Sequence, residues 1–278
     1  MNKIIDAHAH IFPEKIVKGA LDILSKQIQM EPDIYASPDG LIDSMNKNGI
    51  ECSICLPVVV KEEQTISIND YIIELNKKYK NLISLGGIHP DFKDYKKELK
   101  RLKDASVKGI KIHPVYQNCD INDERYVNII NEAFKLGLIV VAHAGLDPGF
   151  PDSRRSDINH TLNLLDKIGK GKLVLAHMGA YGQWDEVKKK LCGKDVYFDC
   201  AMCFGDASKF DGTSYTLMNK DTFEDIFYSH DENKILFGSD IPWGRVKSML
   251  DFVNNTSLSD EQKDKLLYLN AKRLFNID

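Results

Sequence analysis

Two histidines close to the start of the chain, His8 and His10, have the spacing of a metal-binding pair. They are separated by one residue within the apolar run Ile4–Ile11. Residues two apart on a β-strand face the same side and lie about 6.6 Å apart along it, so both imidazoles could reach one divalent ion. A polar face at the edge of a sheet would show the same pattern, and the pair alone leaves both interpretations open.

Three further residues suited to metal binding or proton transfer each follow a short apolar run. His143 ends the run in LIVVAHAG, His177 ends the run in LVLAHMGA, and Asp240 follows the run in ILFGSDIPW. A divalent ion held by imidazole and carboxylate groups lowers the pKa of its water to about 7, which makes hydroxide available at neutral pH. A nearby His or Asp can then accept or relay the proton. This chemistry requires a fold that brings all five residues together.

Short apolar runs rich in β-branched residues recur along the chain and have the character of buried parallel strands. The eight runs are Ile4–Ile11, Cys52–Val58, Leu82–His89, Val107–His113, Leu138–Ala144, Leu173–Ala176, Val196–Ala201 and Ile235–Gly238. Helical patterns lie between or after them at Ser67–Lys80, Asp94–Ala105, Asp123–Leu136 and Ser259–Phe275. Ser259 is the expected N-cap of the last helix. One run in about 35 residues fits a repeating βα unit, and eight such units close a (β/α)8 TIM barrel.

The barrel would place the candidate chemical residues together, because the carboxyl ends of all its strands share one mouth. His8, His10, His143, His177 and Asp240 would then converge from four strands. A doubly wound open sheet is the competing architecture, but its glycine-rich phosphate-binding fingerprint is absent after the first run, in IIDAHAHIFPEK. We find no linker, charge block or low-complexity segment, so we expect residues 1–278 to form a single α/β barrel domain.

The composition excludes several function classes. Hydrophobic residues make up 43% and charged residues 28%, as in ordinary globular proteins. No apolar run is long enough to predict a transmembrane helix. The net charge of -4 gives no general attraction to nucleic acid or to anionic membranes. The amino-terminal segment lacks the apolar stretch of a signal peptide, so we expect a cytoplasmic protein in which the six cysteines form no disulfide framework.

Six motifs, taken in order, resemble those of the amidohydrolase superfamily. They are DAHAHIFP, GIKIHP, VVAHAG, LVLAHMGA, ILFGSDIPW and LNAKRLF, and they cover nearly the whole chain. The chain looks most like the amidohydrolase-related branch, which includes aminocarboxymuconate-semialdehyde decarboxylase and other mononuclear-metal decarboxylases and hydrolases.

The resemblance implies a role for each of the five residues. His8, His10 and His143 would be imidazole ligands of one divalent metal ion. Asp240 would ligate the ion and contact its bound water, and His177 would be the catalytic acid/base residue. Zinc suits imidazole and carboxylate ligands with an open position for water, and manganese or iron could use the same set.

Lys111 lies in GIKIHP on the fourth predicted strand. Binuclear members of the superfamily use a carboxylated lysine on that strand to bridge two metals. The sequence KIHP looks typical of the mononuclear branch, so we expect Lys111 to pair with an inward carboxylate such as Asp6 or to contact the substrate.

Several residues near the strand ends are candidates for binding the substrate. A guanidinium in the loop after the His143 strand would suit a carboxylate. The candidates are Lys111, His113, His89, Arg154, Arg155 and Trp243. For each of them, a role in local loop structure, a solvated surface or packing is the alternative.

The main functional hypothesis is a metal-dependent hydrolase that uses activated water on a small, carboxylate-bearing substrate. The alternative is a nonoxidative decarboxylase of a small unsaturated or aromatic acid, which would use the same ligands. A TatD-like nuclease would share the His-x-His start, but such nucleases usually have a Glu on the fourth predicted strand. No Glu lies between Val107 and His113, so this function is disfavoured. A further alternative is a barrel that binds a ligand without catalysis. In that case, replacing the five residues by alanine would cause no loss of activity. We expect a small-molecule substrate and no nucleic-acid or membrane partner. A homodimer is one option, because related enzymes are often dimers, but the sequence does not set the oligomeric state.

Overall fold

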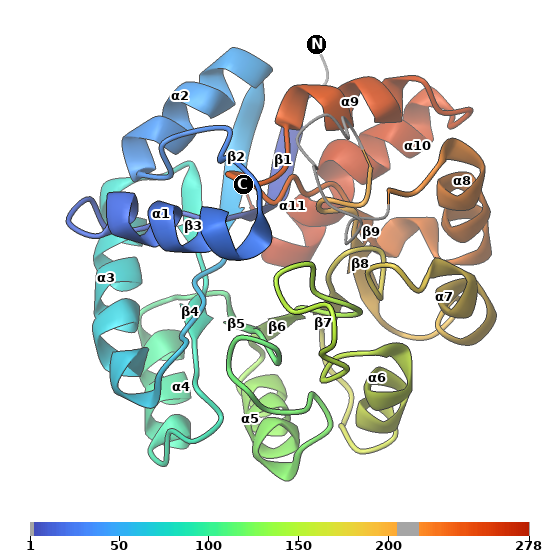
Figure 1. Ribbon diagram of the computed structural model, residues 1–278. Coiled ribbons are helices and arrows are strands. Elements are labelled where there is room, and N and C mark those ends of the chain that lie inside the picture. The colour runs from blue at the N-terminus through green and yellow to red at the C-terminus, as the bar shows by residue number, and fades with distance from the viewer. Residues whose placement is uncertain (1–2, 205–216, 278) are drawn as a thin grey trace.

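The computed structural model describes residues 3–204 and 217–277. Within these residues, short parallel strands follow one another around a ring (Figure 1). The strands are β1 (Ile4–Ala9), β2 (Ile50–Cys55), β3 (Leu82–Ser84), β4 (Gly86–Gly87), β5 (Gly109–Ile112), β6 (Ile139–Ala142), β7 (Leu173–Leu175), β8 (Tyr197–Asp199) and β9 (Ile235–Leu236). All the strand pairs are parallel, which fits the expected repeat of strands and crossover helices.

The ring has eight strand positions, because β3 and β4 are two parts of one interrupted strand. Their break lies at Leu85, whose backbone N–H still donates to the Cys55 carbonyl oxygen at 2.9 Å. The last strand returns to the first, since the Ala7 N–H donates to the Phe237 carbonyl oxygen at 2.8 Å. The predicted (β/α)8 barrel is therefore confirmed.

Helices surround the ring and cover the outer faces of its strands (Figure 1). They are α1 (Val17–Ile28), α2 (Pro38–Asn48), α3 (Thr65–Lys78), α4 (Tyr95–Asp104), α5 (Glu124–Lys135), α6 (Ile158–Leu165), α7 (Trp184–Lys190), α8 (Lys220–Ser229), α9 (Val246–Asn254), α10 (Asp260–Asp264) and α11 (Asn270–Phe275). Helix α1 differs from the others, because it crosses one end of the barrel instead of lying along its side (Figure 1).

The carboxyl-terminal helix begins where the sequence predicts. The Ser259 hydroxyl accepts a hydrogen bond from the Gln262 N–H, and the Gln262 side chain accepts one from the Ser259 N–H, which forms a capping box. The helix is not uniform, however: α10 and α11 are joined by a π-helical turn at Lys265–Leu269. No helix among the described residues combines the length and apolarity needed to cross a bilayer.

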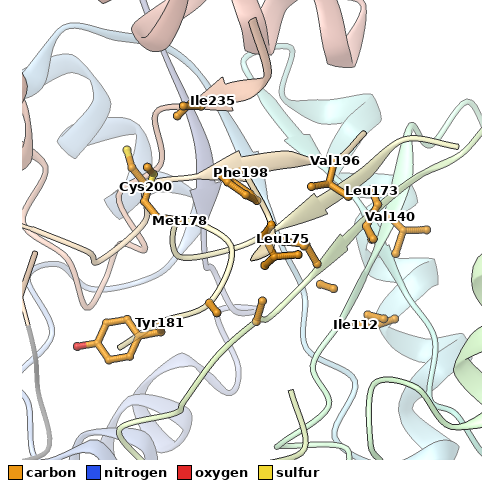
Figure 2. Close-up of a cluster of buried hydrophobic side chains, with 14 of the residues drawn as sticks. Ile112, Val140, Leu173, Leu175, Met178, Tyr181, Val196, Phe198, Cys200 and Ile235 are labelled. Atoms are coloured by element: carbon orange, nitrogen blue, oxygen red, sulfur yellow. The ribbon is translucent and has the colours of Figure 1, made fainter. Parts of the chain in front are cut away.

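Alternation along the strands separates an outer core from the ring interior. Ile110 and Ile112 on β5 belong to the large outer cluster of buried apolar residues between strands and helices, whereas Lys111 between them faces the ring. Figure 2 shows part of this outer cluster, with Ile112 and Phe198 among the side chains drawn. In a strand that follows this alternation, every second side chain faces the ring interior, and the last of these side chains lies at the mouth of the barrel.

Candidate metal centre

A cavity of about 610 Å³ opens at the carboxyl ends of the strands. The predicted chemical residues all line it: His8, His10, His143, His177 and Asp240. The convergence expected from the sequence is therefore present in the structure.

Three ligand atoms form the tightest group in this cavity. The Nε2 atoms of His8 and His10 lie 3.2 Å apart. Oδ1 of Asp240 lies 2.9 Å from Nε2 of His10 and 3.5 Å from Nε2 of His8. Bonds of about 2.0–2.1 Å in a tetrahedral zinc site place neighbouring ligand atoms about 3.3 Å apart. The spacing of these three atoms thus fits a single divalent ion.

In both His8 and His10, the hydrogen bond made by Nδ1 determines that Nε2 is the nitrogen directed at the other two ligand atoms. Nδ1 of His10 lies 2.7 Å from the Leu56 carbonyl oxygen, which can only accept, so Nδ1 carries the hydrogen. Nδ1 of His8 lies 2.9 Å from Oδ2 of Asp199 and donates to that carboxylate. Both Nε2 lone pairs then face each other beside the Asp240 carboxylate. A divalent metal ion placed among these three atoms would be bound by all of them.

The electrostatic environment favours the metal-binding forms. Burial, with a contribution from the Lys111 ammonium, lowers the pKa of His8 to about 4, so its imidazole is neutral at pH 7. Burial alone would raise the pKa of Asp240, but the His8 and His10 imidazoles beside it outweigh burial and hold that pKa far below its usual value. At neutral pH the group therefore offers the neutral imidazole of His8 and the carboxylate of Asp240.

His177 has its Nε2 on the cavity side, 3.1 Å from Nδ1 of His143. Its Nδ1 lies 2.8 Å from the Ala201 carbonyl oxygen and donates to it, so Nε2 carries the lone pair. The His177 ring centroid lies 5.3 Å from that of His8. His177 and Asp240 both adopt left-handed backbone conformations, with φ of 60° and 63°. Such conformations are uncommon outside glycine and concentrate at functional sites.

His143 shares the cavity but lies outside the group of three. Its Nδ1 is 3.1 Å from Nε2 of His177, while its buried Nε2 has no hydrogen-bond partner. The imidazoles of His113 and His143 stack with ring centroids 4.2 Å apart. With Asp147 they make a second group, whose ligand atoms lie within 4.8 Å of one another. The role of His143 as third ligand of the first group stays a prediction.

Two buried aspartates of the site were missed by the sequence reasoning. Asp199 ends β8 and accepts hydrogen bonds from the backbone N–H groups of His177 at 3.0 Å and Ala201 at 3.1 Å, besides that from His8. Asp147 lies 3.7 Å from Nε2 of His143, and burial raises its pKa to about 7. Asp199 could have been found by applying the strand-end rule to the run Val196–Ala201, in which it stands.

Lys111 faces the group formed by His8, His10 and Asp240. Its Nζ lies 3.4 Å from Nε2 of His8, and burial lowers its pKa to about 8. The carboxylates that act on it are Asp199, Asp240 and Asp147. The expected pairing with Asp6 is not formed, because the Asp6 carboxylate accepts hydrogen bonds from the Ser239 hydroxyl and backbone N–H instead.

The remaining substrate-binding candidates divide into two sets. His113 and Trp243 line the cavity, as does Lys111. Arg154 and Arg155 lie outside it. Arg154 donates to the carbonyl oxygens of Pro151 and Ser153, and Arg155 donates to the side chains of Asp120 and Asn118. His89 is also outside the cavity lining, and its Nδ1 accepts a hydrogen bond from the Asp91 N–H.

A family model described as Amidohydrolase matches residues 5–277. The chain belongs to the amidohydrolase family. The resemblance inferred from the motifs is thereby confirmed over nearly the whole chain. A search of curated proteins found no significant match.

Solved structures of several decarboxylases have a similar fold. The 2,6-dihydroxybenzoate decarboxylase from Rhizobium is 17% identical, with a TM-score of 0.68 over 100% of this chain and 99% of that one. The 5-carboxyvanillate decarboxylase from Sphingomonas paucimobilis is 14% identical, with a TM-score of 0.69 over 100% of both chains. The dihydroxybenzoic acid decarboxylase from Polaromonas sp. JS666, which carries bound manganese and the inhibitor 2-nitroresorcinol, is 17% identical, with a TM-score of 0.70 over 99% and 97%. At these identities the likeness concerns the fold.

Proposed function

We propose that this amidohydrolase is a metal-dependent hydrolase that adds water to a small, carboxylate-bearing substrate. The proposal rests on the orientation of His177. The hydrogen bond from its Nδ1 to the Ala201 carbonyl oxygen at 2.8 Å turns Nε2 toward the cavity, beside Nδ1 of His143 at 3.1 Å. A neutral imidazole in this position can take a proton from water as it attacks the substrate.

Each residue of the centre has a separate task in this proposal. His8, His10 and Asp240 hold the ion, with His143 as the third imidazole. The ion, when bound, acts as a Lewis acid and lowers the pKa of water to about 7. His177 accepts the proton at Nε2. Lys111 is the only lysine or arginine among the described residues that line the cavity, and it offers the cation for a substrate carboxylate or a developing oxyanion.

The test separates metal binding from proton transfer. The wild-type protein, expressed with metal supplementation, should contain about one equivalent of divalent metal per chain by elemental analysis. His8→Ala should lose the metal, because one of the converging lone pairs is removed. His177→Ala should retain most of the metal and lose turnover. If no metal is found in the wild-type protein, or if His177→Ala loses metal as readily as His8→Ala, this division of roles is wrong.

A second candidate function is nonoxidative decarboxylation. Solved structures of similar fold include enzymes named for decarboxylation of dihydroxybenzoate and carboxyvanillate. His177 and Lys111 could deliver a proton to the carbon that loses the carboxyl group. Two assays decide between the reactions. Aromatic and unsaturated acids are tested for carbon dioxide release, and amides, esters and lactones are tested for hydrolysis. Release of carbon dioxide without hydrolysis of any candidate would replace the first proposal with the second.

We propose zinc as the ion, because two imidazoles and a carboxylate at tetrahedral spacing suit it. Manganese is the alternative, since it occupies the decarboxylase from Polaromonas sp. JS666. Titration of the metal-free protein with each ion ranks them. A cytoplasmic location and the absence of nucleic-acid and membrane partners remain predictions from the sequence, and a homodimer remains one option.

A further inference from the structure

The cavity extends well beyond the metal-binding group, along one face of α1. Ile16, Ala20, Ile23 and Leu24 all line it. Their spacing places them on one side of the helix, while Val17 and Leu21 are buried on another side. Helix α1 therefore has two apolar faces, one packed on the protein and one lining the cavity mouth.

The opposite wall of this outer region is also apolar. It comes from the segment after β2 and from the first turns of α3, and its apolar members are Val58, Val60, Ile68, Tyr71 and Ile72. Gln64 and Ser67 are the uncharged polar residues on this wall. None of the lysine, aspartates and histidines of the cavity lining comes from α1 or from residues 58–72, so these two walls contribute no charged side chain to the lining.

The apolar surface continues to the entrance. Ile23 is 68% exposed, Ile16 is 54% exposed and Val60 is 43% exposed, although all three are large apolar side chains. A substrate no larger than the metal-binding group would leave these walls in water. The cavity volume of about 610 Å³ falls instead within the range of about 300–1,000 Å³ typical of sites for larger organic ligands.

We propose that the outer region, between α1 and the first turns of α3, is a subsite for the alkyl or aryl tail of an amphipathic substrate. The polar head of that substrate would lie at His8, His10 and Asp240. The subsite deepens the proposed function and rests on it for the position of the head. A tail is favoured over a second copy of the chain because the apolar walls are concave and continuous with the metal-binding group in one cavity.

The test uses straight-chain alkyl hydroxamates, whose head chelates divalent metals, from two to ten carbons. Dissociation constants for the zinc-loaded protein are measured by calorimetry. The affinity should increase by up to about fourfold for each added methylene until the subsite is full. An affinity that does not depend on chain length would overturn the subsite.

Two variants and a matched control locate the tail. Ala20→Trp fills the subsite from α1, and Val60→Glu places a charge on the opposite wall. Both should flatten the chain-length dependence and leave the affinity for acetohydroxamate unchanged. Lys18→Trp adds the same indole at an exposed position of α1 outside the cavity lining and should behave as the wild type. Unchanged chain-length dependence in both of the first two variants would refute the placement.

The same series distinguishes failure of the subsite from failure of the proposed function. Binding of acetohydroxamate with no gain from longer chains contradicts the subsite alone. A gain from longer chains without binding of acetohydroxamate contradicts the metal-centred head and leaves the subsite standing. If no hydroxamate binds, both are wrong. If Ile23→Glu converts a dimer into a monomer and chain length has no effect, the face is an interface between copies and the subsite is refuted.

Discussion

The hydrogen bond between Asp199 and His8 makes a specific prediction about metal affinity. In Asp199→Asn the new amide has almost the same shape as the carboxyl group. Its oxygen must stay where Oδ1 now accepts hydrogen bonds from the backbone N–H groups of His177 and Ala201, at 3.0 and 3.1 Å. The amide nitrogen then takes the place of Oδ2, which lies 2.9 Å from Nδ1 of His8, and it faces that atom as a donor. His8 can satisfy this donor only by moving its hydrogen from Nδ1 to Nε2.

The changed tautomer opposes metal binding directly. A hydrogen on Nε2 of His8 removes the lone pair that points at His10 and Asp240, where Nε2 of His10 lies 3.2 Å away and can accept it. The hydrogen bonds of His8 are therefore all satisfied in the metal-free variant. Metal binding must move the hydrogen of His8 back from Nε2 to Nδ1. Turning the amide around would leave two backbone donors facing a third donor, at a cost of about 1–3 kcal/mol for each unsatisfied group. We expect a loss of about 10–100-fold in metal affinity, or about 1.4–2.7 kcal/mol.

Competition with a zinc chelator of known affinity measures this loss, and circular dichroism checks that the variant is folded. Asp157→Asn is the matched control. Asp157 caps α6 by accepting a hydrogen bond from the His160 N–H at 2.9 Å, and asparagine is as good an N-cap as aspartate. The control should keep wild-type metal affinity. A folded Asp199→Asn protein that binds zinc as tightly as the wild type would show that Asp199 does not set the tautomer of His8.

Three further predictions concern stability. Burial raises the pKa of Asp147 to about 7. Between about pH 4 and 7 the folded protein therefore keeps this carboxyl protonated while the unfolded chain ionises it. The free energy of unfolding falls as the pH rises through this range. Asp147→Asn should therefore raise the melting temperature of the metal-free protein at pH 8 and not at pH 4; an equal change at both pH values would contradict this. Gly145→Ala would place Cβ 1.9 Å from the Tyr181 nitrogen at φ of 91°, whereas Gly193→Ala at φ of 81° meets nothing within 4 Å. In urea unfolding, Gly193→Ala should cost about 1–2 kcal/mol and Gly145→Ala clearly more; equal losses would show that the steric contact is relieved. Phe198→Ala should cost about 3–5 kcal/mol in the same assay, because Phe198 is fully buried, and a loss below 1 kcal/mol would refute that packing.

The barrel and the convergence of the five residues could be predicted because both depend on local patterns. Each strand was visible as a short apolar run, and each candidate side chain stood at or just after the end of its run. The rule that parallel strands share one mouth then brought His8, His143 and Asp240 together from separate parts of the chain. The family resemblance added roles, but the placement itself needed only strand ends.

The parts that escaped prediction depend on geometry that no local pattern carries. The interruption at Leu85 divides the third strand, although its run reads as continuous. Whether Arg155 reaches the cavity depends on the path of its loop, which directs the guanidinium to Asp120 and Asn118. Asp199 is different, because the strand-end rule applied to the run Val196–Ala201 would have proposed it, and only its contact with His8 needed the structure.

In the proposed function, the residues that act on the reacting group and the walls that contact the substrate tail come from different segments of this chain. The metal-binding group comes from the ends of β1 and from the residues after β9, whose positions the closed ring of hydrogen bonds determines. One wall of the proposed subsite, α1, comes from the connection between β1 and β2, which contains two helices, α1 and α2. A barrel tolerates changes in such a connection without disturbing the strand ends. Under this proposal, α1 can vary with the substrate while His8, His10 and Asp240 stay the same. These three residues alone therefore do not separate hydrolysis from decarboxylation, and the cavity walls are where the proposal places that difference.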